Sequence, residues 1–140
     1  MTPDAAALLS AFESAAISHA DWTHRAHLQV ALACLTLDPL EDAIARFRKG
    51  IMDLNAAHGV PQTDTGGYHE TLTQAYLRLI DVHLRGLPPS STFEAREASV
   101  LATFADKEVI LRHYSRARIM SREARFGFLP PDLLPFEQLS

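Results

Sequence analysis

Apolar residues recur at helical spacing through most of the chain, and the breaks between these runs carry proline, glycine or capping residues. Thr2-Pro3 has the form of a helix N-cap followed by proline in the first turn, and the spacing after it predicts a first helix over residues 3–17. Residues 24–37 are apolar almost all round until Asp38-Pro39 stops the run, so they predict a central, buried helix.

The pattern continues with two more long helices. Asp38 can cap the third helix with proline at its first position, and the apolar stripe ends near His58-Gly59, where glycine is a natural C-cap. A loop by composition follows over residues 60–67. The fourth helix is expected to open close to Tyr68 and to continue to Arg85-Gly86.

The last third of the chain is more interrupted. Residues 93–104 and 106–114 predict two further helices or one bent helix. The tail from 126 to 140 carries three prolines among large apolar residues, so it is expected to pack as an extended strap across the bundle.

Composition agrees with this pattern. Ala and Leu supply 40 of the 140 residues whereas Val and Ile supply only 11, which favours helix over strand. We therefore expect an all-α fold, a compact single domain over residues 1–140 with about five or six helices in a bundle and an extended Pro-rich C-terminal strap.

The net charge and the N-terminal sequence limit the classes of partner and the location that we expect. The formal net charge of −4 argues against nucleic acid or an acidic membrane as the main partner, and a small molecule is the expected ligand. The N-terminus has no secretory signal pattern, so a cytoplasmic protein is expected. The single cysteine, Cys34, excludes an internal disulfide and is expected to be a buried hydrophobe. A homo-oligomer is left open.

Seven histidines are the candidate chemistry. His24 and His27 stand three residues apart on one face of the predicted second helix, and that face continues with apolar residues, so both rings should point into the bundle. His69 lies on the inward stripe of the fourth helix, after the glycine pair at 66 and 67. Its neighbour Glu70 is turned away by the helical period and is expected to be a favourable anion at a helix N-terminus.

If the second and fourth helices are neighbours, His24, His27 and His69 converge near one end of the bundle. Three imidazoles around an open position suit a divalent ion, zinc first, which would activate a bound water. His58 could be a fourth ligand or only complement a helix C-terminus, His113 is a further auxiliary, and His19 and His83 are expected to be surface or satisfied residues.

A polar stretch beyond residue 105 supplies the other candidates. Tyr114 lies on an apolar stripe and can reach inward, and Arg116 or Lys107 could hold an anionic substrate group by charge-assisted hydrogen bonds. The predicted catalytic residues are therefore His69, Tyr114 and Arg116, although most basic runs of this kind are solvated faces.

Two sequence blocks of this chain resemble those of a protein family. They read Trp22-Thr23-His24-Arg25-Ala26-His27-Leu28 and Gly66-Gly67-Tyr68-His69-Glu70-Thr71-Leu72-Thr73. With them the chain resembles a family of small uncharacterised bacterial proteins, and the resemblance spans most of its length. It implies a compact helical fold and assigns no functional residue.

Three functions remain open at this point. The first is a metal-dependent enzyme, such as a hydrolase, acting on a small molecule through zinc held by the three histidines. The second is a non-catalytic ligand-binding or interaction domain in which buried histidines only hydrogen-bond and fix the helix packing. The third is metal-free general-base catalysis on an anionic substrate held near Gly67, His69 and Arg116.

Overall fold

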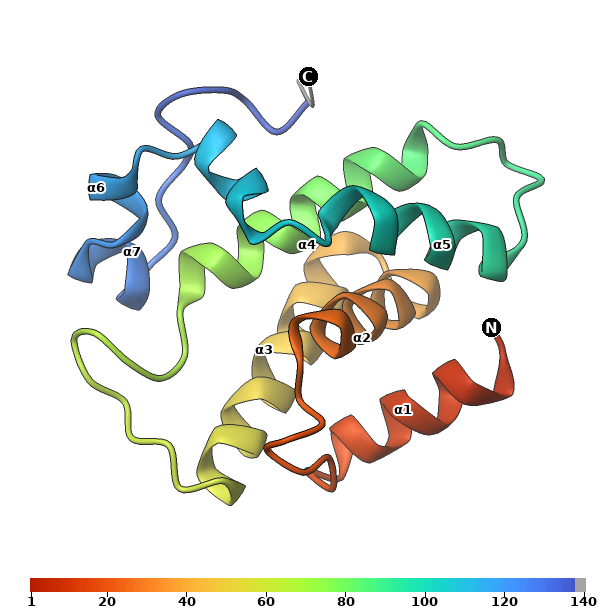
Figure 1. Cartoon of the computed structure of the whole chain (residues 1–140), viewed down its shortest axis with the longest axis horizontal. Coiled ribbons are helices and arrows are strands. Elements are labelled where there is room, and N and C mark those ends of the chain that lie inside the picture. Colours follow the sequence, from red (N-terminus) through yellow and green to blue (C-terminus); the bar gives the residue numbers. More distant parts are fainter. Residues whose placement is uncertain (138–140) are drawn as a thin grey trace.

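Residues 1–137, which the computed structural model describes, form seven α-helices and one 3-10 helix and contain no strand (Figure 1). The all-α expectation is thereby confirmed, and the helix count is close to the predicted one. The elements are α1 (Pro3–Glu13), α2 (His24–Leu37), α3 (Leu40–Ala57), α4 (Glu70–Arg85), α5 (Phe93–Phe104), the 3-10 helix η1 (Lys107–Arg112), α6 (Arg116–Ile119) and α7 (Arg122–Phe126).

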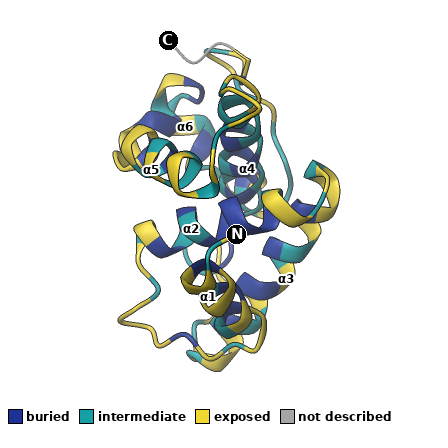
Figure 2. Ribbon diagram, turned by 90° about the vertical axis from the view of Figure 1, so that its right-hand side faces the viewer, coloured by how far each residue is buried: buried dark blue, intermediate teal, exposed yellow. Residues whose placement is uncertain are grey.

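The central helix is α2, and it begins and ends where the sequence predicts. The Thr23 side chain accepts a hydrogen bond from the Ala26 N–H and caps its first turn. α2 contacts α1, α3, α4 and α5, and Figure 2 shows buried residues along it and on the inner faces of α3 and α4. No helix within residues 1–137 is long and apolar enough to cross a membrane.

The first helix is shorter than predicted. It ends at Glu13, because Ala15 adopts a left-handed backbone conformation with φ 55°. The Ala16 N–H then bonds the Ala11 carbonyl and the Ala15 N–H bonds the Phe12 carbonyl, which is the Schellman pattern of helix termination. Apolar spacing alone did not reveal this stop, since glycine is the residue that normally marks it.

The third helix starts one residue later than a cap at Asp38 implies. Pro39 is the N-cap, with an extended ψ of 158° and no side-chain cap. The Asp38 carboxylate instead accepts a 2.7 Å hydrogen bond from the Arg46 guanidinium, which also pairs with Glu13 on α1 at 3.1 Å. Asp38 thus ties the α2–α3 corner to α1.

The fourth helix opens at Glu70, two residues after the predicted start, and a loop over residues 58–69 leads into it. Gly67 lies in the left-handed region at φ +87°, and a Cβ there would come 2.9 Å from the Pro61 carbonyl oxygen. The Gln62 side chain accepts a hydrogen bond from the Tyr68 N–H and donates hydrogen bonds to the Gly66 and Tyr68 carbonyls. These bonds between residues of the loop fix its conformation.

Residues 106–126 are less regular than expected. The stretch predicted as a helix over 106–114 forms only a 3-10 helix, and it is followed by the two short helices α6 and α7, which the sequence pattern did not predict. Both begin at a serine N-cap, Ser115 and Ser121. Helices of one turn are too short to show a hydrophobic period.

The tail after α7 is extended, as predicted, and packs against the start of α4 and the residues that follow η1. Its last three residues, 138–140, lie outside the described residues. Thr71 on α4 donates its hydroxyl to the Gly127 carbonyl and accepts from the Leu129 N–H. The Tyr114 hydroxyl donates to the Leu129 carbonyl at 2.6 Å, and Phe136 is buried at the end of the strap. The strap is therefore fixed to the core by side chains that precede it in the chain.

Candidate functional site

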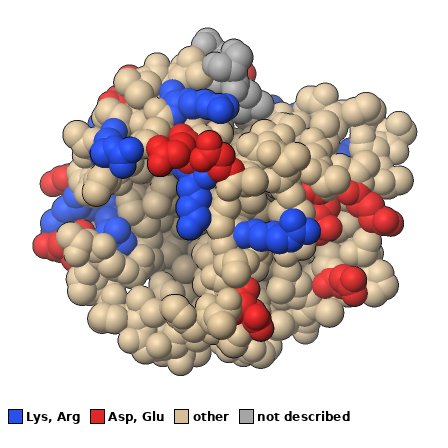
Figure 3. Space-filling view, in the orientation of Figure 1, with Lys and Arg blue, Asp and Glu red and all other residues tan. Residues whose placement is uncertain are grey.

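A cavity of about 680 Å³ lies where the start of α2, the end of α3, the loop before α4, η1 and α6 meet. Figure 3 shows this face of the molecule hollowed, with basic side chains at the upper edge of the hollow. Five of the seven histidines line the cavity: His19, His24, His27, His58 and His69. The three predicted to converge are all among them.

His27 is held in one orientation. Its ring lies on the Trp22 indole, with centroids 3.8 Å apart and an interplanar angle of 28°. Its Nδ1 is 2.7 Å from the Thr23 carbonyl oxygen, and because a carbonyl only accepts, Nδ1 carries the proton. Burial lowers the pKa of His27, so the ring is neutral at pH 7 and Nε2 has a free lone pair.

His24 and His58 are arranged in a similar way. His24 Nε2 donates to the Phe104 carbonyl at 2.8 Å, and His58 Nε2 donates to the Ile17 carbonyl at 2.8 Å. In each ring Nε2 is therefore the nitrogen that bonds the backbone, and Nδ1 is the other ring nitrogen. The sequence allowed His58 only an auxiliary role, and the exposed His19, whose ring packs edge-on against His58, was expected to be a surface residue.

His69 differs because both of its ring nitrogens are engaged. Nε2 donates to the Ile119 carbonyl at 2.8 Å, and Nδ1 accepts the Leu72 N–H at 3.1 Å. His69 is thus the N-cap of α4 and not a residue of its first turn, as the apolar stripe implied. In this arrangement it has no lone pair for an ion and no proton acceptor for a substrate.

The other two predicted catalytic residues lie in different places. Tyr114 is fully buried, its hydroxyl is bonded to the strap, and it is not in the cavity wall. Arg116 does line the cavity, and its guanidinium lies 3.7 Å from the Glu108 carboxylate. The structure therefore brings Arg116 to the histidines and turns Tyr114 toward the tail.

The charged side chains of the cavity are mostly basic. They are Lys107, Arg116 and Arg125 against the single acid Glu108. Arg125 on α7 donates to the Gly67 and Thr65 carbonyls, so it fixes the loop before α4. Within residues 1–137 the Lys107 ammonium has no carboxylate within 4 Å. No sequence pattern singles out Arg125, because its position depends on the packing of α7 against α4.

Glu70 has a structural role at the contact between α4 and α3. Its carboxylate accepts two hydrogen bonds from Arg48, at 2.9 and 2.6 Å, one from the Tyr68 hydroxyl at 2.6 Å and one from Gln74 at 2.6 Å. These bonds outweigh burial and lower the pKa of Glu70, and burial raises that of Tyr68. The first turn of α4 is thereby bound to α3.

The predicted zinc ligands do not form a ligand set in this geometry. Among residues 1–137 no three His, Cys, Asp or Glu side chains are close enough together to share an ion. His24 and His27 each have one ring nitrogen that does not bond the backbone, whereas a catalytic zinc site takes three protein ligands. Zinc binding stays a prediction of the sequence.

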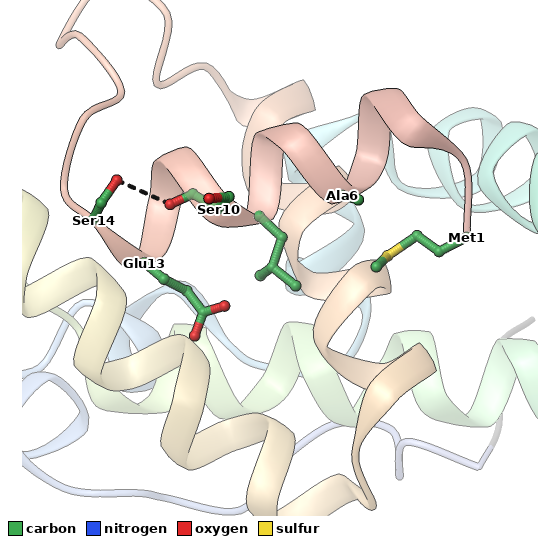
Figure 4. A pocket seen from close by; sticks show the side chains of 6 residues that line it. Met1, Ala6, Ser10, Glu13 and Ser14 are labelled. Carbon is green, nitrogen blue, oxygen red and sulfur yellow. Dashed lines mark hydrogen bonds between the residues drawn. The ribbon is translucent and has the colours of Figure 1, made fainter.

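A second hollow runs along α1 (Figure 4). It has a volume of about 390 Å³ and is lined by residues of α1 together with Met1. The Ser14 hydroxyl donates to the Ser10 carbonyl there, and Glu13 pairs with Arg46. No histidine, lysine or arginine lines this hollow, so the cavity at α2 is the candidate site.

No protein-family model matches the chain, and neither a curated protein nor a solved structure matches it. The resemblance to small bacterial helical proteins stays a prediction. The geometry and chemistry of the cavity carry the functional inference.

Proposed function

We propose that the cavity binds a small organic molecule that has an apolar body and an anionic group. The observation that carries this proposal is an apolar cavity whose charged side chains are mainly basic, in a chain of net charge −4. Its volume of about 680 Å³ falls in the range of roughly 300–1,000 Å³ that is typical of small-molecule sites.

The apolar body would lie against the inner wall. That wall is formed by Trp22 and by aliphatic side chains of α2, α3, α4 and η1, among them Leu28, Ile51, Leu72 and Ile110. Each apolar Å² that a ligand removes from water here contributes about 25 cal/mol before the costs of binding.

The anionic group would lie at the rim, near Lys107 and Arg116. Both side chains belong to exposed residues, so they can turn toward a ligand. Arg116 is only loosely paired with Glu108 at 3.7 Å, and Lys107 has no carboxylate partner within residues 1–137. Charge-assisted hydrogen bonds from these two groups would select an anion.

Binding is tested with anilinonaphthalene sulfonate, a fluorescent probe with an apolar body and one anionic group. Trp22 is the only tryptophan and lines the cavity, so bound probe should quench its fluorescence by energy transfer at one probe per chain. Lys107→Gln should weaken binding by about two- to fivefold, as expected for one exposed ion pair of roughly 0.5–1 kcal/mol.

Lys49→Gln is the matched control, since Lys49 is an exposed lysine of α3 outside the cavity. It should leave the affinity unchanged. The uncharged analogue N-phenylnaphthylamine should bind without sensitivity to either substitution. The absence of saturable quenching, or an equal effect of the two lysine variants, would contradict the proposal.

A zinc-dependent hydrolase is the second candidate, because His24 and His27 each have a ring nitrogen that does not bond the backbone and both line the same cavity. Elemental analysis of protein purified without a histidine tag tests it. Stoichiometric metal that is lost in both His24→Ala and His27→Ala supports it, and metal-free wild-type protein excludes it. In either case we expect a cytoplasmic bacterial protein whose ligand is a small molecule.

A further inference from the structure

One histidine that lines the cavity, His27, has a ring nitrogen that is free to accept a proton. His27 Nε2 has no hydrogen-bond partner within residues 1–137. Every fully buried side-chain nitrogen or oxygen in that range does have a partner, so His27 Nε2 is not fully buried. Nε2 is therefore open to the cavity that the ring lines. The Thr23 carbonyl fixes the tautomer, and the Trp22 indole fixes the plane of the ring.

The other cavity histidines are less suited to this task. His69 has both nitrogens engaged. The free nitrogen of His58 belongs to a ring that packs on exposed His19, at the edge of the cavity. His24 packs edge-on against Tyr76 with centroids 5.7 Å apart, so it lacks the stacked aromatic neighbour that fixes the plane of the His27 ring.

We propose that His27 is a general base, and that this cavity catalyses proton abstraction from a weak carbon acid bound beside the His27 ring. This inference rests on the proposed binding function and names the chemistry of the same site. The substrate class is a small molecule with an apolar body and an acidic C–H bond. No metal and no co-reactant is needed.

The step balances within the site. The lone pair on His27 Nε2 forms the new N–H bond, the substrate C–H bond breaks, and its electron pair stays on the substrate. The imidazolium keeps its Nδ1–H bond to Thr23. Lys107 lines the same cavity, so its positive charge would stabilise the anion that forms on the substrate. Return of the proton to another atom of that anion gives an isomer.

Nitrobenzisoxazole is the probe for the reaction. Removal of its ring proton drives the electron pair into a nitrile as the N–O bond of the ring breaks, and the coloured cyanonitrophenolate that forms is followed by absorbance. Wild-type protein should accelerate the reaction with saturation. His27→Gln should lower the catalysed rate at least tenfold, because a positioned base contributes about 10²–10⁴-fold in an evolved site.

His83→Gln is the matched control, because His83 bonds the Ser99 hydroxyl outside the cavity and its loss should change the rate by less than about twofold. Anilinonaphthalene sulfonate should inhibit competitively. The proposal is overturned if wild-type protein is no faster than an equal concentration of free imidazole, or if His27→Gln keeps the full rate.

A measurement on the wild-type chain guards against a variant that fails to fold. Diethyl pyrocarbonate acylates unprotonated, accessible imidazole nitrogens, and mass spectrometry locates the label. His27 should be labelled and should be protected by anilinonaphthalene sulfonate, exposed His19 should be labelled and so shows that the reagent is active, and His69 should not react.

An unlabelled His27 beside a labelled His19 overturns the proposal. If the sulfonate probe still binds in that case, the base assignment fails and the binding function stands. If the probe does not bind at all, the proposed function fails first.

Discussion

Five of the seven histidines bond a backbone carbonyl through one ring nitrogen, and what distinguishes them is the fate of the other nitrogen. In His69 it accepts an N–H and caps a helix, whereas in His27 it faces the cavity. Residue type and spacing in the sequence do not distinguish His27 from His69. Only the hydrogen-bond partners of the two rings separate a structural imidazole from a reactive one.

A glycine also shows how one neighbour decides a residue's role. Gly50 lies inside α3, where glycine normally weakens a helix by roughly 0.5–1 kcal/mol relative to alanine. Here the Phe12 ring occupies the space of the missing side chain, and a Cβ on Gly50 would lie 2.0 Å from Phe12 Cε2. Phe12 in turn stacks on Trp22 and Phe47, so it has little room to move.

Gly50→Ala should therefore destabilise the protein by about 1–3 kcal/mol, because overpacking exceeds the gain in helix propensity. Chemical denaturation measures the change in the free energy of unfolding. Gly86→Ala is the control, since a Cβ there would make only ordinary contact, at 3.4 Å from the His83 carbonyl oxygen. A Gly50→Ala variant as stable as the wild type would show that Phe12 is free to shift.

At the scale of elements, polar side chains connect segments that are distant in the sequence. Thr71 in the first turn of α4 both donates to and accepts from the strap, at Gly127 and Leu129. His113 and Tyr114 hold the strap at Leu134 and Leu129. Prolines keep the strap from forming a helix, and these bonds place it over the core.

Thr71→Val should cost about 1–3 kcal/mol, because it leaves a strap N–H and a strap carbonyl without their partner at a buried site. Limited proteolysis should then cut the strap faster than in the wild type. Thr36→Val is the matched control: Thr36 bonds only the Leu32 carbonyl of its own helix, and its loss should leave the strap protected. Equal cleavage in both variants would refute the tether.

At the scale of the whole molecule, burial of neutral histidines makes stability depend on pH. Burial lowers the pKa of His27, His69 and His83 in the folded chain. As pH falls below the unfolded value of about 6.5, the unfolded chain takes up protons that the folded chain does not, so the free energy of unfolding decreases. Glu70, whose folded pKa is lowered, loses its contribution only at more acidic pH.

The melting temperature should therefore fall between about pH 7 and pH 5 at constant ionic strength. Thermal melts followed by circular dichroism measure it. His83→Gln should reduce the slope, since it removes one of the three groups. A melting temperature that stays constant or rises over this interval would contradict the neutral, buried state of these rings.

Much of this fold was predictable from the sequence, and part of the site was. The bounds of α2 follow from the Thr23 cap and the Asp38-Pro39 stop, and the placement of His24 and His27 in the cavity wall follows from helical spacing. The end of α1 at Ala15 did not follow, because a left-handed alanine leaves no mark in the pattern. The direction of Tyr114 did not follow either, because the strap that receives its hydroxyl lies 15 residues further on.

The sequence by itself determined the all-helical fold and the face on which the histidines lie, because helical period and caps are local properties. Only the tertiary structure decided that His58, Lys107 and Arg116 join that face around one cavity, that His69 is a cap and that His27 keeps a free nitrogen. Those outcomes depend on which carbonyls and aromatic rings meet each imidazole from other elements, and that is fixed by packing between distant parts of the chain.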